Sequence, residues 1–273
     1  MGLSWLIRLL NGNRGRRNEI EQMKKDFISH VSHELKAPLA SMQETTHLIL
    51  ERIPGPLTEK QERLLQLNLQ SGKRLAAMIG NLLDFSRLEA GIVDYEMQLQ
   101  DVRELVQSVV TELTPRAHEK ALHIMVDFPE EALMTMCDPN RMIQVFTNLL
   151  DNAVRFSSKG GSVSLRMDEV GTPPTNAARP PYSPEGYILL SISDSGPGIE
   201  GLTKDRIFGS FPQVEQGKKT FGQSLGLGLA ISRALIEAHQ GTIWVEDNPN
   251  GGSVFSVLLP KASAQFETLD LAS

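Results

Sequence analysis

Residues 27–39 read FISHVSHELKAPL, a stretch with two histidines three positions apart, a glutamate directly after the second, and a proline. It lies within an apolar pattern over residues 20–42 that has the spacing of a long amphipathic helix. At 100° per residue the apolar stripe centres near Val31, which places His33 roughly 160° away and His30 about 100° away. His33 is therefore expected to face solvent, whereas His30 is expected at the edge of the packed stripe.

A solvent-facing histidine on a rigid helix is an accessible nucleophile, because a neutral imidazole nitrogen has a free lone pair. Glu34 can accept the proton of the other ring nitrogen, which fixes the tautomer and stabilises the cation formed on attack. Pro38 has no N–H to donate to the carbonyl of Glu34, so a bend is expected at this turn. An ordinary surface histidine is the competing interpretation. A zinc site at His30 and His33 is disfavoured, since no third ligand cluster lies nearby in the sequence.

A second helix is expected after the break IPGPLTEK (53–60), which contains two prolines and a glycine. Gly91 is expected to end this helix. Its apolar residues have heptad-like spacing: Leu64, Leu67, Leu75, Met78, Leu82 and Phe85. Two long antiparallel helices expose a wider apolar stripe than one hairpin can cover. Pairing two hairpins into a four-helix bundle would bury that stripe, so we expect a homodimer.

After Gly91 the pattern changes to alternating strands and helices. Strands are expected at residues 94–99, 122–128, 133–137, 162–169, 187–193, 241–246 and 253–259. Helices are expected at residues 101–119, 139–156 and 226–239. The proline-rich segment GTPPTNAARPPYSPEG (171–186) is expected to connect two strands. This order predicts an α/β sandwich with a mostly antiparallel sheet.

Composition limits the partners and the compartment. With 27 Lys and Arg against 33 Asp and Glu, the formal net charge is -6, which argues against nucleic acid as the main partner. No window approaches the roughly 20 apolar residues that cross a bilayer. The single cysteine, Cys137, allows no internal disulfide and is expected to be buried, which suits the cytoplasm. The apolar and basic residues of 1–17 would allow peripheral contact with an anionic membrane, although a frayed end is the simpler interpretation.

Residues 144–157, QVFTNLLDNAVRFS, place Asn148, Asn152 and Arg155 on one face of an expected helix, with apolar residues on the other. Amides are poor helix formers, so two of them four positions apart in a helix interior suggest a role. They could hold a hydrated Mg²⁺ ion and phosphate oxygens, with Arg155 neutralising charge. An ordinary polar helix face has the same pattern.

The stretch ILLSISDSGPGIE (188–200) reads as a buried strand that runs into a glycine turn. Asp194 at its end could accept a hydrogen bond from an exocyclic amine. Gly196 and Gly198 would let a flat ring approach the backbone. A plain turn is the alternative.

A second glycine-rich stretch, SLGLGLAISRALIEAH (224–239), opens a helix whose free N–H groups and dipole attract phosphate. Two polar segments lie between the two glycine-rich stretches, IFGSF (207–211) and GKKTFGQS (217–224). They are expected to form a lid that carries Lys218 and Lys219 over the phosphates. A glycine loop by itself is weak support for a nucleotide site.

Taken in order, these motifs resemble those of the sensor histidine kinases of two-component systems. FISHVSHELKAPL is similar to that family's phosphoacceptor box, with His33 at the phosphorylated position. NLLDNAVRF resembles its N box, DSGPGI its first glycine box, IFGSF its phenylalanine box and GLGLAI its second glycine box. All five occur in the family's order, roughly over residues 19 to 260, and this ordered agreement is far more specific than any one motif.

The resemblance implies an α+β chain in which a dimerisation and histidine phosphotransfer domain (19–90) precedes a Bergerat-type ATP-binding domain (91–262). Residues 1–18 form a lead segment too short for a folded sensor, and residues 263–273 a tail. The implied partner is the receiver domain of a response regulator, whose aspartate takes the phosphoryl group from His33.

The resemblance also implies roles for single residues. His33 takes the γ-phosphoryl group of ATP, Glu34 assists it, and Asn152 holds Mg²⁺. The remaining nucleotide contacts that the resemblance implies are Asn148, Arg155, Asp194, Gly226 and Gly228. The sequence motifs add Gly196, Gly198, Lys218, Lys219 and Leu227 to the expected nucleotide contacts.

Two departures from the family pattern affect what we expect. Many such kinases have threonine or asparagine four residues after the histidine, where it positions a water that dephosphorylates the partner. This chain has Ala37 there, and a methyl group cannot orient water, so weak phosphatase activity is expected. Ser224 replaces the leading glycine of the second glycine box, which would stiffen the lid without abolishing nucleotide binding.

Two other functions compete with the kinase. ATPases of the same nucleotide-binding superfamily, such as gyrase or MutL, place a glutamate as general base one turn before the magnesium asparagine. This chain has Asn148 there, which cannot take a proton from water. The second alternative is a catalytically inactive dimeric scaffold, and the presence of a suitable residue at every chemical position argues against it.

Overall fold

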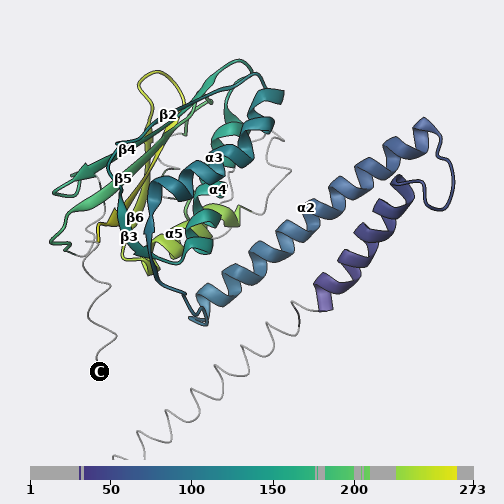
Figure 1. Cartoon of the computed structure of the whole chain (residues 1–273), viewed down its shortest axis with the longest axis horizontal. Helices are drawn as coiled ribbons and strands as arrows, with labels where there is room; N and C mark the ends of the chain where they lie inside the picture. Colours follow the sequence, from purple (N-terminus) through teal and green to yellow (C-terminus); the bar gives the residue numbers. More distant parts are fainter. Residues whose placement is uncertain are drawn as a thin grey trace, which may run out of the picture. The chain divides into compact units, whose positions relative to one another are not determined.

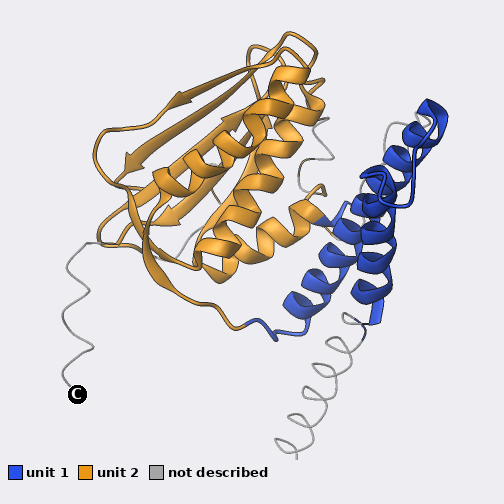
Figure 2. Cartoon of the chain, turned by 45° about the vertical axis from the view of Figure 1, so that its right-hand side comes forward, with its two compact units in different colours: residues 1–93, 217–227 blue, residues 94–216, 228–273 orange. Residues whose placement is uncertain are grey.

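The computed structural model describes residues 31, 34–175, 177, 182–199, 204, 206–209 and 226–262. The chain divides into two compact units, one of residues 1–93 and 217–227, the other of residues 94–216 and 228–273 (Figure 2). Three predicted site residues, His33, Lys218 and Lys219, lie outside the described residues, as does His30. Among the residues that are described, no helix is both long and apolar enough to cross a membrane.

The first unit contains two helices, residues 34–50 and α2 (Glu59–Glu89), joined by a turn (Figure 1). The turn confirms the predicted break. A capping box starts α2, because the Thr58 side chain accepts from the Gln61 N–H and the Gln61 side chain accepts from the Thr58 N–H. Gly91, at φ 67°, follows the end of α2, where its conformation suits glycine.

This hairpin buries little of its own apolar surface. Among its described residues, Leu39 and Leu83 are the only buried apolar side chains. Eight large apolar side chains are exposed on it: Leu35, Met42, Leu48, Ile53, Leu64, Leu67, Leu75 and Leu82. The wide uncovered stripe expected from the sequence is therefore present.

The second unit is an α/β sandwich. Its strands are β1 (Gln98–Asp101), β2 (His123–Asp127), β3 (Met134–Cys137), β4 (Ser162–Val170), β5 (Tyr187–Ser193), β6 (Thr242–Asp247) and β7 (Ser253–Pro260). Its helices are α3 (Val102–Glu119), α4 (Pro139–Phe156) and α5 (Leu227–Ala238). The main sheet has the order β2-β4-β5-β7-β6, and β1 pairs with β3 in a separate ribbon. Only the β2–β4 pair is parallel, which confirms the expected mostly antiparallel sheet.

The first strand differs from the expectation. It begins at Gln98 and ends at Asp101, whereas the sequence pattern predicted residues 94–99. The reason is a side-chain contact, because the Glu96 N–H donates to a carboxylate oxygen of Asp138 at 3.2 Å instead of joining a strand ladder. The preceding residues are thereby tied to the start of α4.

Helices α3, α4 and α5 cover one face of the main sheet, and the core lies between the two layers (Figure 1). Alternate residues of β4 and β5 face this core, and on the helix side Phe146, Leu149 and Leu150 of α4 are fully buried. Each fully buried side chain of this size contributes about 1.5–3 kcal/mol. Cys137 is buried, as expected. The proline-rich segment 171–186 joins the antiparallel strands β4 and β5, which confirms the predicted connection.

Candidate functional site

Helix α4 carries the amide and arginine side chains that the sequence singled out. Asp138 caps its first turn by accepting from the backbone N–H groups of residues 140 and 141. Asn148, Asn152 and Arg155 are half-buried on one face, and the residues on the other face pack into the core. The shared face predicted from their spacing is therefore present.

Asn148 holds α4 against α5. Its Nδ2 donates to the Ser232 hydroxyl at 2.8 Å, and a Cβ atom placed on Gly228 would lie only 2.4 Å from its Oδ1. A side chain at residue 228 would therefore displace the Asn148 amide from this hydrogen bond, so Gly228 has a packing role beside the phosphate-loop role inferred from the sequence. Ser232 is buried and was not identified as a site residue from the sequence, although it lies one turn after Gly228 on the same helix.

Arg155 contacts its neighbours on α4. Its Nη2 donates to Asn152 Oδ1 at 2.8 Å, and its Cζ lies 4.4 Å from the centre of the Phe156 ring. Its Nε–H is buried and has no acceptor among the described residues. Burial lowers the pKa of the Arg155 guanidinium, the nearby Asp151 charge opposes that shift, and Arg116 adds to it. Among the described residues Arg155 forms no ion pair, and Asp151, the carboxylate whose charge acts on it, is paired with Arg116.

Asp194 is buried at the end of β5 and accepts two backbone hydrogen bonds on one oxygen. Its Oδ1 accepts from the N–H of Gly196 at 2.8 Å and from the N–H of Ser253 at 3.2 Å. Among the described residues, no group donates to Oδ2. Burial raises the pKa of the Asp194 carboxyl, while the two N–H groups act in the opposite direction. The oxygen left free is an acceptor in a site of low polarity, which suits an amine donor.

The turn between β6 and β7 encloses Asp194. The Asn248 side-chain amide donates to the Asp194 carbonyl at 3.0 Å. A Cβ atom on Gly252 would lie 2.1 Å from that same carbonyl, and the φ of Gly252 is 99°, so only glycine fits there. Sequence reasoning missed both residues as parts of the site, although NPNGG between two strands was a visible turn signal.

The Asp194 turn lies against the C-terminal end of α4, so the two candidate sets come together. The Ser195 N–H donates to the Ser157 hydroxyl at 3.2 Å, and a Cβ atom on Gly196 would lie 3.0 Å from the Phe156 carbonyl. Lys120 stabilises the same end of α4 by donating to the carbonyls of Val154, Arg155 and Ser157 at 2.7–3.1 Å. The role of Lys120 was not visible in the sequence, since it comes from a different helix–strand connection.

The other predicted residues are placed as follows. Gly198 and Gly226 have φ values of 78° and 69°, a region that favours glycine. Leu227 is the first residue of α5 and is buried. Glu34 is exposed on the first described helix of the other unit. Among the described residues no cluster of three or more His, Cys, Asp or Glu side chains could hold a metal ion.

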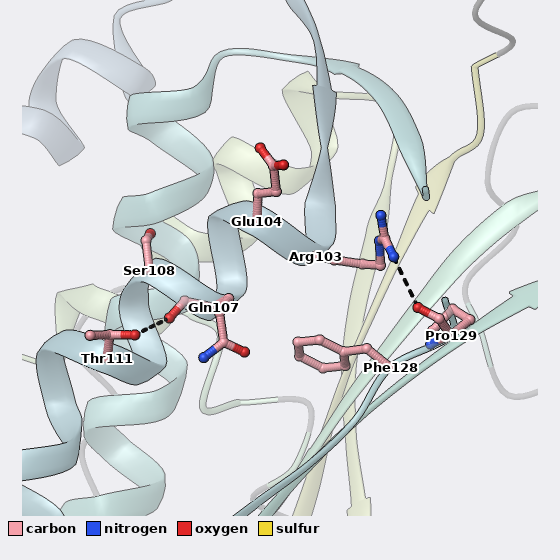
Figure 3. Close-up of a pocket in the computed structure, with 7 residues that line it drawn as sticks. All are labelled: Arg103, Glu104, Gln107, Ser108, Thr111, Phe128 and Pro129. Atoms are coloured by element: carbon pink, nitrogen blue, oxygen red, sulfur yellow. Dashed lines mark hydrogen bonds between the residues drawn. The ribbon is translucent and has the colours of Figure 1, made fainter. Parts of the chain in front are cut away.

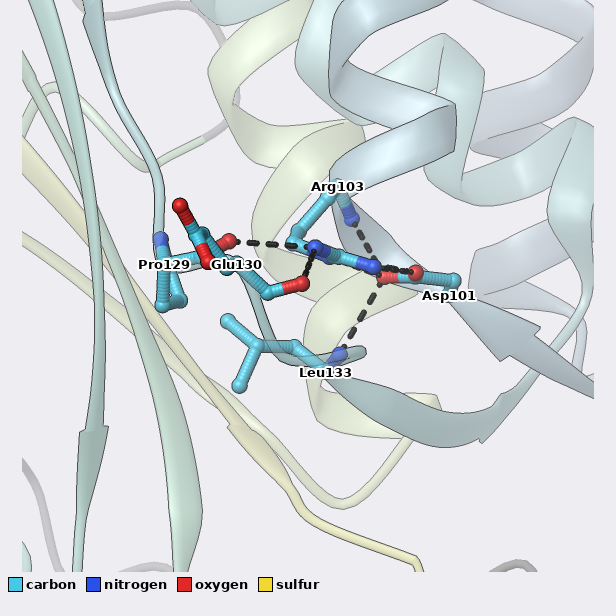
Figure 4. Close-up of polar contacts among 5 residues, drawn as sticks. All are labelled: Asp101, Arg103, Pro129, Glu130 and Leu133. Carbon is cyan, nitrogen blue, oxygen red and sulfur yellow. Dashed lines mark hydrogen bonds and ion pairs between the residues drawn. The ribbon is translucent and has the colours of Figure 1, made fainter.

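A hollow of about 420 Å³ lies elsewhere in the second unit and does not include any predicted site residue. It is lined by Arg103, Glu104, Gln107, Ser108, Thr111, Phe128 and Pro129 (Figure 3). Arg103 pairs with Asp101 at 2.6 Å and donates to the Pro129 and Glu130 carbonyls, while Asp101 also accepts from the Leu133 N–H (Figure 4). The one cation of the hollow is therefore used to fasten a loop to the start of α3. We place the candidate site at Asp194 and α4, where unpaired polar groups converge.

Two family profiles match separate parts of the chain. Residues 23–91 match the His Kinase A (phospho-acceptor) domain. Residues 137–263 match the family described as histidine kinase-, DNA gyrase B- and HSP90-like ATPase.

Similar proteins carry both parts. Sensor protein SrrB of Staphylococcus aureus (strain MRSA252) is 31% identical over 246 residues, which are 89% of this chain and 39% of SrrB. Hybrid signal transduction histidine kinase D of Dictyostelium discoideum is 29% identical over 242 residues, 89% of this chain and 15% of that protein. The crystal structure of full-length ShkA in complex with AMPPNP matches with a TM-score of 0.70 and 26% identity, over 88% of this chain and 46% of ShkA.

The chain thus spans less than half of the length of each of these relatives. The order of the two matched parts is the order of the helical and α/β units, and Asp194 and the α4 face lie within the second matched part. This chain belongs to the sensor histidine kinases of two-component systems.

Proposed function

We propose that the chain is an ATP-dependent protein histidine kinase that phosphorylates itself on His33 and passes the phosphoryl group to an aspartate of a response regulator. The observation that carries this proposal is the convergence of two features. A buried Asp194 with one free carboxylate oxygen lies beside the end of a helix that carries two amides and an arginine whose buried Nε–H has no acceptor among the described residues. A purine amine and a polyphosphate would satisfy the two features together.

For the nucleotide, we propose that Asp194 Oδ2 accepts from the exocyclic amine of adenine, with Gly196 and Gly198 leaving space for the ring. Arg155, Lys218 and Lys219 would neutralise the phosphates. The N-terminal end of α5, with Gly226, Leu227 and Gly228, would offer backbone N–H groups to the same phosphates.

For the metal, the residues present fit Mg²⁺ held mainly by phosphates and water. Asn152 Oδ1 is an uncharged oxygen ligand, and Asn148 lies one turn away on the same face. The chemistry that a bound Mg²⁺ supplies is neutralisation of charge on the phosphate oxygens.

In the proposed reaction a ring nitrogen of His33 attacks the γ-phosphorus, and a nitrogen–phosphorus bond forms as the bond to the bridging oxygen of ADP breaks. The electron pair of the broken bond leaves with ADP. Glu34 receives the proton of the other ring nitrogen, which keeps the phosphorylated imidazole neutral. Transfer to the receiver aspartate then breaks the nitrogen–phosphorus bond and forms an oxygen–phosphorus bond.

The proposed assembly is a homodimer through the helical hairpin, because its eight exposed apolar side chains need cover that the hairpin does not provide. We place the phosphotransfer domain at residues 19–90 and the catalytic domain at 91–262, close to the division between the two compact units. Peripheral membrane contact through residues 1–17 and a cytoplasmic site of action complete the proposal.

An ATPase is the main alternative, since one matched family includes gyrase- and HSP90-like ATPases. The position one turn before Asn152 argues against it, because Asn148 donates to Ser232 and offers no carboxylate to take a proton from water. An inactive scaffold would have no need for the Arg155 Nε–H to stay buried without an acceptor among the described residues.

The test is a phosphorylation assay with γ-labelled ATP. We expect a label that is lost in acid and kept in base, present in the native chain and absent in His33→Gln. A label that survives the substitution would exclude His33 as the acceptor. Steady release of phosphate without any label would favour the ATPase, and neither label nor release would favour the scaffold.

A further inference from the structure

We propose that Arg155 is a positioning residue that covers the metal-binding oxygen of Asn152 until a polyphosphate draws it away. The inference rests on the proposed function, because it assumes that the α4 face receives nucleotide phosphates and Mg²⁺. Its consequence is an order of binding in which the phosphates come first and the metal ligand is exposed only afterwards.

The resting place of Arg155 is built from its own helix. Its Nη2 donates at 2.8 Å to Oδ1 of Asn152, which lies one turn earlier on α4. The guanidinium carbon lies 4.4 Å from the centre of the Phe156 ring, so an aromatic face supports the cation from another side. Both contacts hold the guanidinium on the α4 face beside the predicted metal ligand.

This arrangement opposes metal binding. Oδ1 is the oxygen through which the Asn152 amide can bind Mg²⁺, and one of its lone pairs accepts from Arg155. A positive charge within hydrogen-bond distance of that oxygen also repels a divalent cation. Asn152 is therefore ready to bind a metal only after the guanidinium has moved.

The resting place is also incomplete. The Nε–H of Arg155 is buried without an acceptor among the described residues, and burial disfavours the charged guanidinium. A phosphate group can accept from two N–H groups of one guanidinium, and such charge-assisted bonds are about twice as strong as neutral ones. Exchange of the amide oxygen for a phosphate would satisfy the Nε–H and free Asn152 in one movement.

A lysine at this position would behave differently. A lysine ammonium is a compact, strongly hydrated charge. It lacks the planar guanidinium group that can donate to an amide oxygen and lie over an aromatic ring at the same time. The covering of Asn152 is thus a property of arginine followed by phenylalanine in this chain.

The experiment measures binding of AMPPNP to the full chain by titration calorimetry, once in EDTA and once in Mg²⁺. In EDTA we expect Asn152→Ala to bind AMPPNP about three- to tenfold more tightly than the native chain, because Arg155 is released from one hydrogen bond. In Mg²⁺ the same variant should bind more weakly than the native chain, because the metal ligand is gone. AMPPNP affinity that rises in EDTA and falls in Mg²⁺ is the result expected if Arg155 blocks Asn152 Oδ1.

Two further variants separate this result from a general effect on α4. In an Arg155→Met background, Asn152→Ala should give no gain in EDTA. Phe156→Leu keeps the charge and both amides but removes the aromatic face, so a gain of about twofold in EDTA is expected. Thermal melting followed by circular dichroism checks that each variant is folded.

Each result decides between the ideas. If the native chain binds no AMPPNP in either condition, the proposed nucleotide site fails. If the native chain binds but Asn152→Ala and Phe156→Leu show no gain in EDTA, the nucleotide site stands and the cover is refuted. A gain that persists in the Arg155→Met background would also refute it.

Discussion

The two units bury their apolar residues to very different degrees. In the described part of the hairpin two apolar side chains are buried and eight large ones are exposed, whereas the α/β unit buries a core between its sheet and three helices. The hairpin therefore leaves an apolar stripe that a second chain could cover, whereas the α/β unit buries a core of its own. Changes to exposed residues should affect the first unit most, and changes to buried residues the second.

The largest effect is expected from a charge on the hairpin stripe. Leu75 is 43% exposed on α2, and Leu75→Glu would place an unpaired carboxylate inside the proposed dimer. Because an unpaired buried charge costs about 3–5 kcal/mol, the dimer dissociation constant should rise more than about 100-fold. Light scattering coupled to size exclusion measures the mass. Gln70→Glu adds the same charge to an exposed polar position on α2 and should leave the mass unchanged.

The complementary change is a cavity in the α/β unit. Leu149 is fully buried on α4, so Leu149→Ala should lower the free energy of unfolding of that unit by about 2–5 kcal/mol. Urea unfolding followed by Trp244 fluorescence in a Trp5→Phe background measures it. Leu67→Ala on the exposed hairpin stripe is the control, and an equal effect of both substitutions on the Trp244 transition would contradict the comparison.

A third change, at Asp194, separates stability from nucleotide binding in the α/β unit. Burial raises the pKa of Asp194, so the folded state holds that proton more tightly than the unfolded state does. Stability therefore falls as the pH rises from 3.8 through the folded pKa, and at pH 7 the buried carboxylate is a cost. Asp194→Asn keeps the oxygen that accepts from Gly196 and Ser253 and removes this charge.

We expect Asp194→Asn to melt at the same or a higher temperature and to bind AMPPNP at least about tenfold more weakly, because an amide donor would face the adenine amine. Calorimetry of melting and of binding gives both numbers on one sample. A variant that melts much lower while it still binds AMPPNP would show that Asp194 is structural.

The sequence predicted most of this architecture because local signals and tertiary packing agree. Thr58 and Gly91 mark the ends of α2, and the spacing of Asn148, Asn152 and Arg155 gives their common face. Agreement of this kind is what a uniquely folding sequence needs. The first strand lies at Gln98–Asp101 and not at the predicted residues 94–99, because the Glu96 N–H donates to the Asp138 side chain.

The parts that were missed depend on contacts between distant segments. Ser232 and Gly252 enter the site only because α5 approaches α4 and because the β6–β7 turn folds over Asp194. The contact of Arg155 with Asn152 was equally invisible, because a helical spacing of three allows but does not require it. The candidate site residues could be predicted from their own motifs, whereas the contacts that support them depend on how distant segments pack in the fold.

The smallest effect is expected from the change in stability of the α/β unit with pH. His239 is buried at the end of α5, its Nε2 accepts from the Asp138 N–H at 3.0 Å, and its Nδ1 lies 2.7 Å from the Leu235 carbonyl. Because Nε2 accepts, Nδ1 must carry the proton, and the ring is neutral. Tyr95 packs edge-on against it with 5.2 Å between ring centres.

Burial lowers the pKa of His239 from 6.5, while the Leu235 carbonyl and the Asp138 charge oppose the shift. The unfolded state therefore binds more protons in the window below pH 6.5, so the stabilising contribution is present above 6.5 and is lost as the pH falls through the folded pKa. We expect the free energy of unfolding of the α/β unit to fall between pH 7.5 and 5.5. The Trp244 transition in urea, measured at each pH, gives the slope.

The matched variant is His239→Gln, whose side-chain oxygen can still accept from the Asp138 N–H but does not titrate. Its pH slope should be smaller than that of the native chain, and the difference between the two isolates His239 from the carboxyl groups, including Asp194 with its opposite slope. The hairpin contains no part of this contact, so dimer mass should not change over the same range. Equal slopes in the two proteins would exclude His239 as the source, and an NMR titration of the native ring gives an independent check if the variant fails to fold.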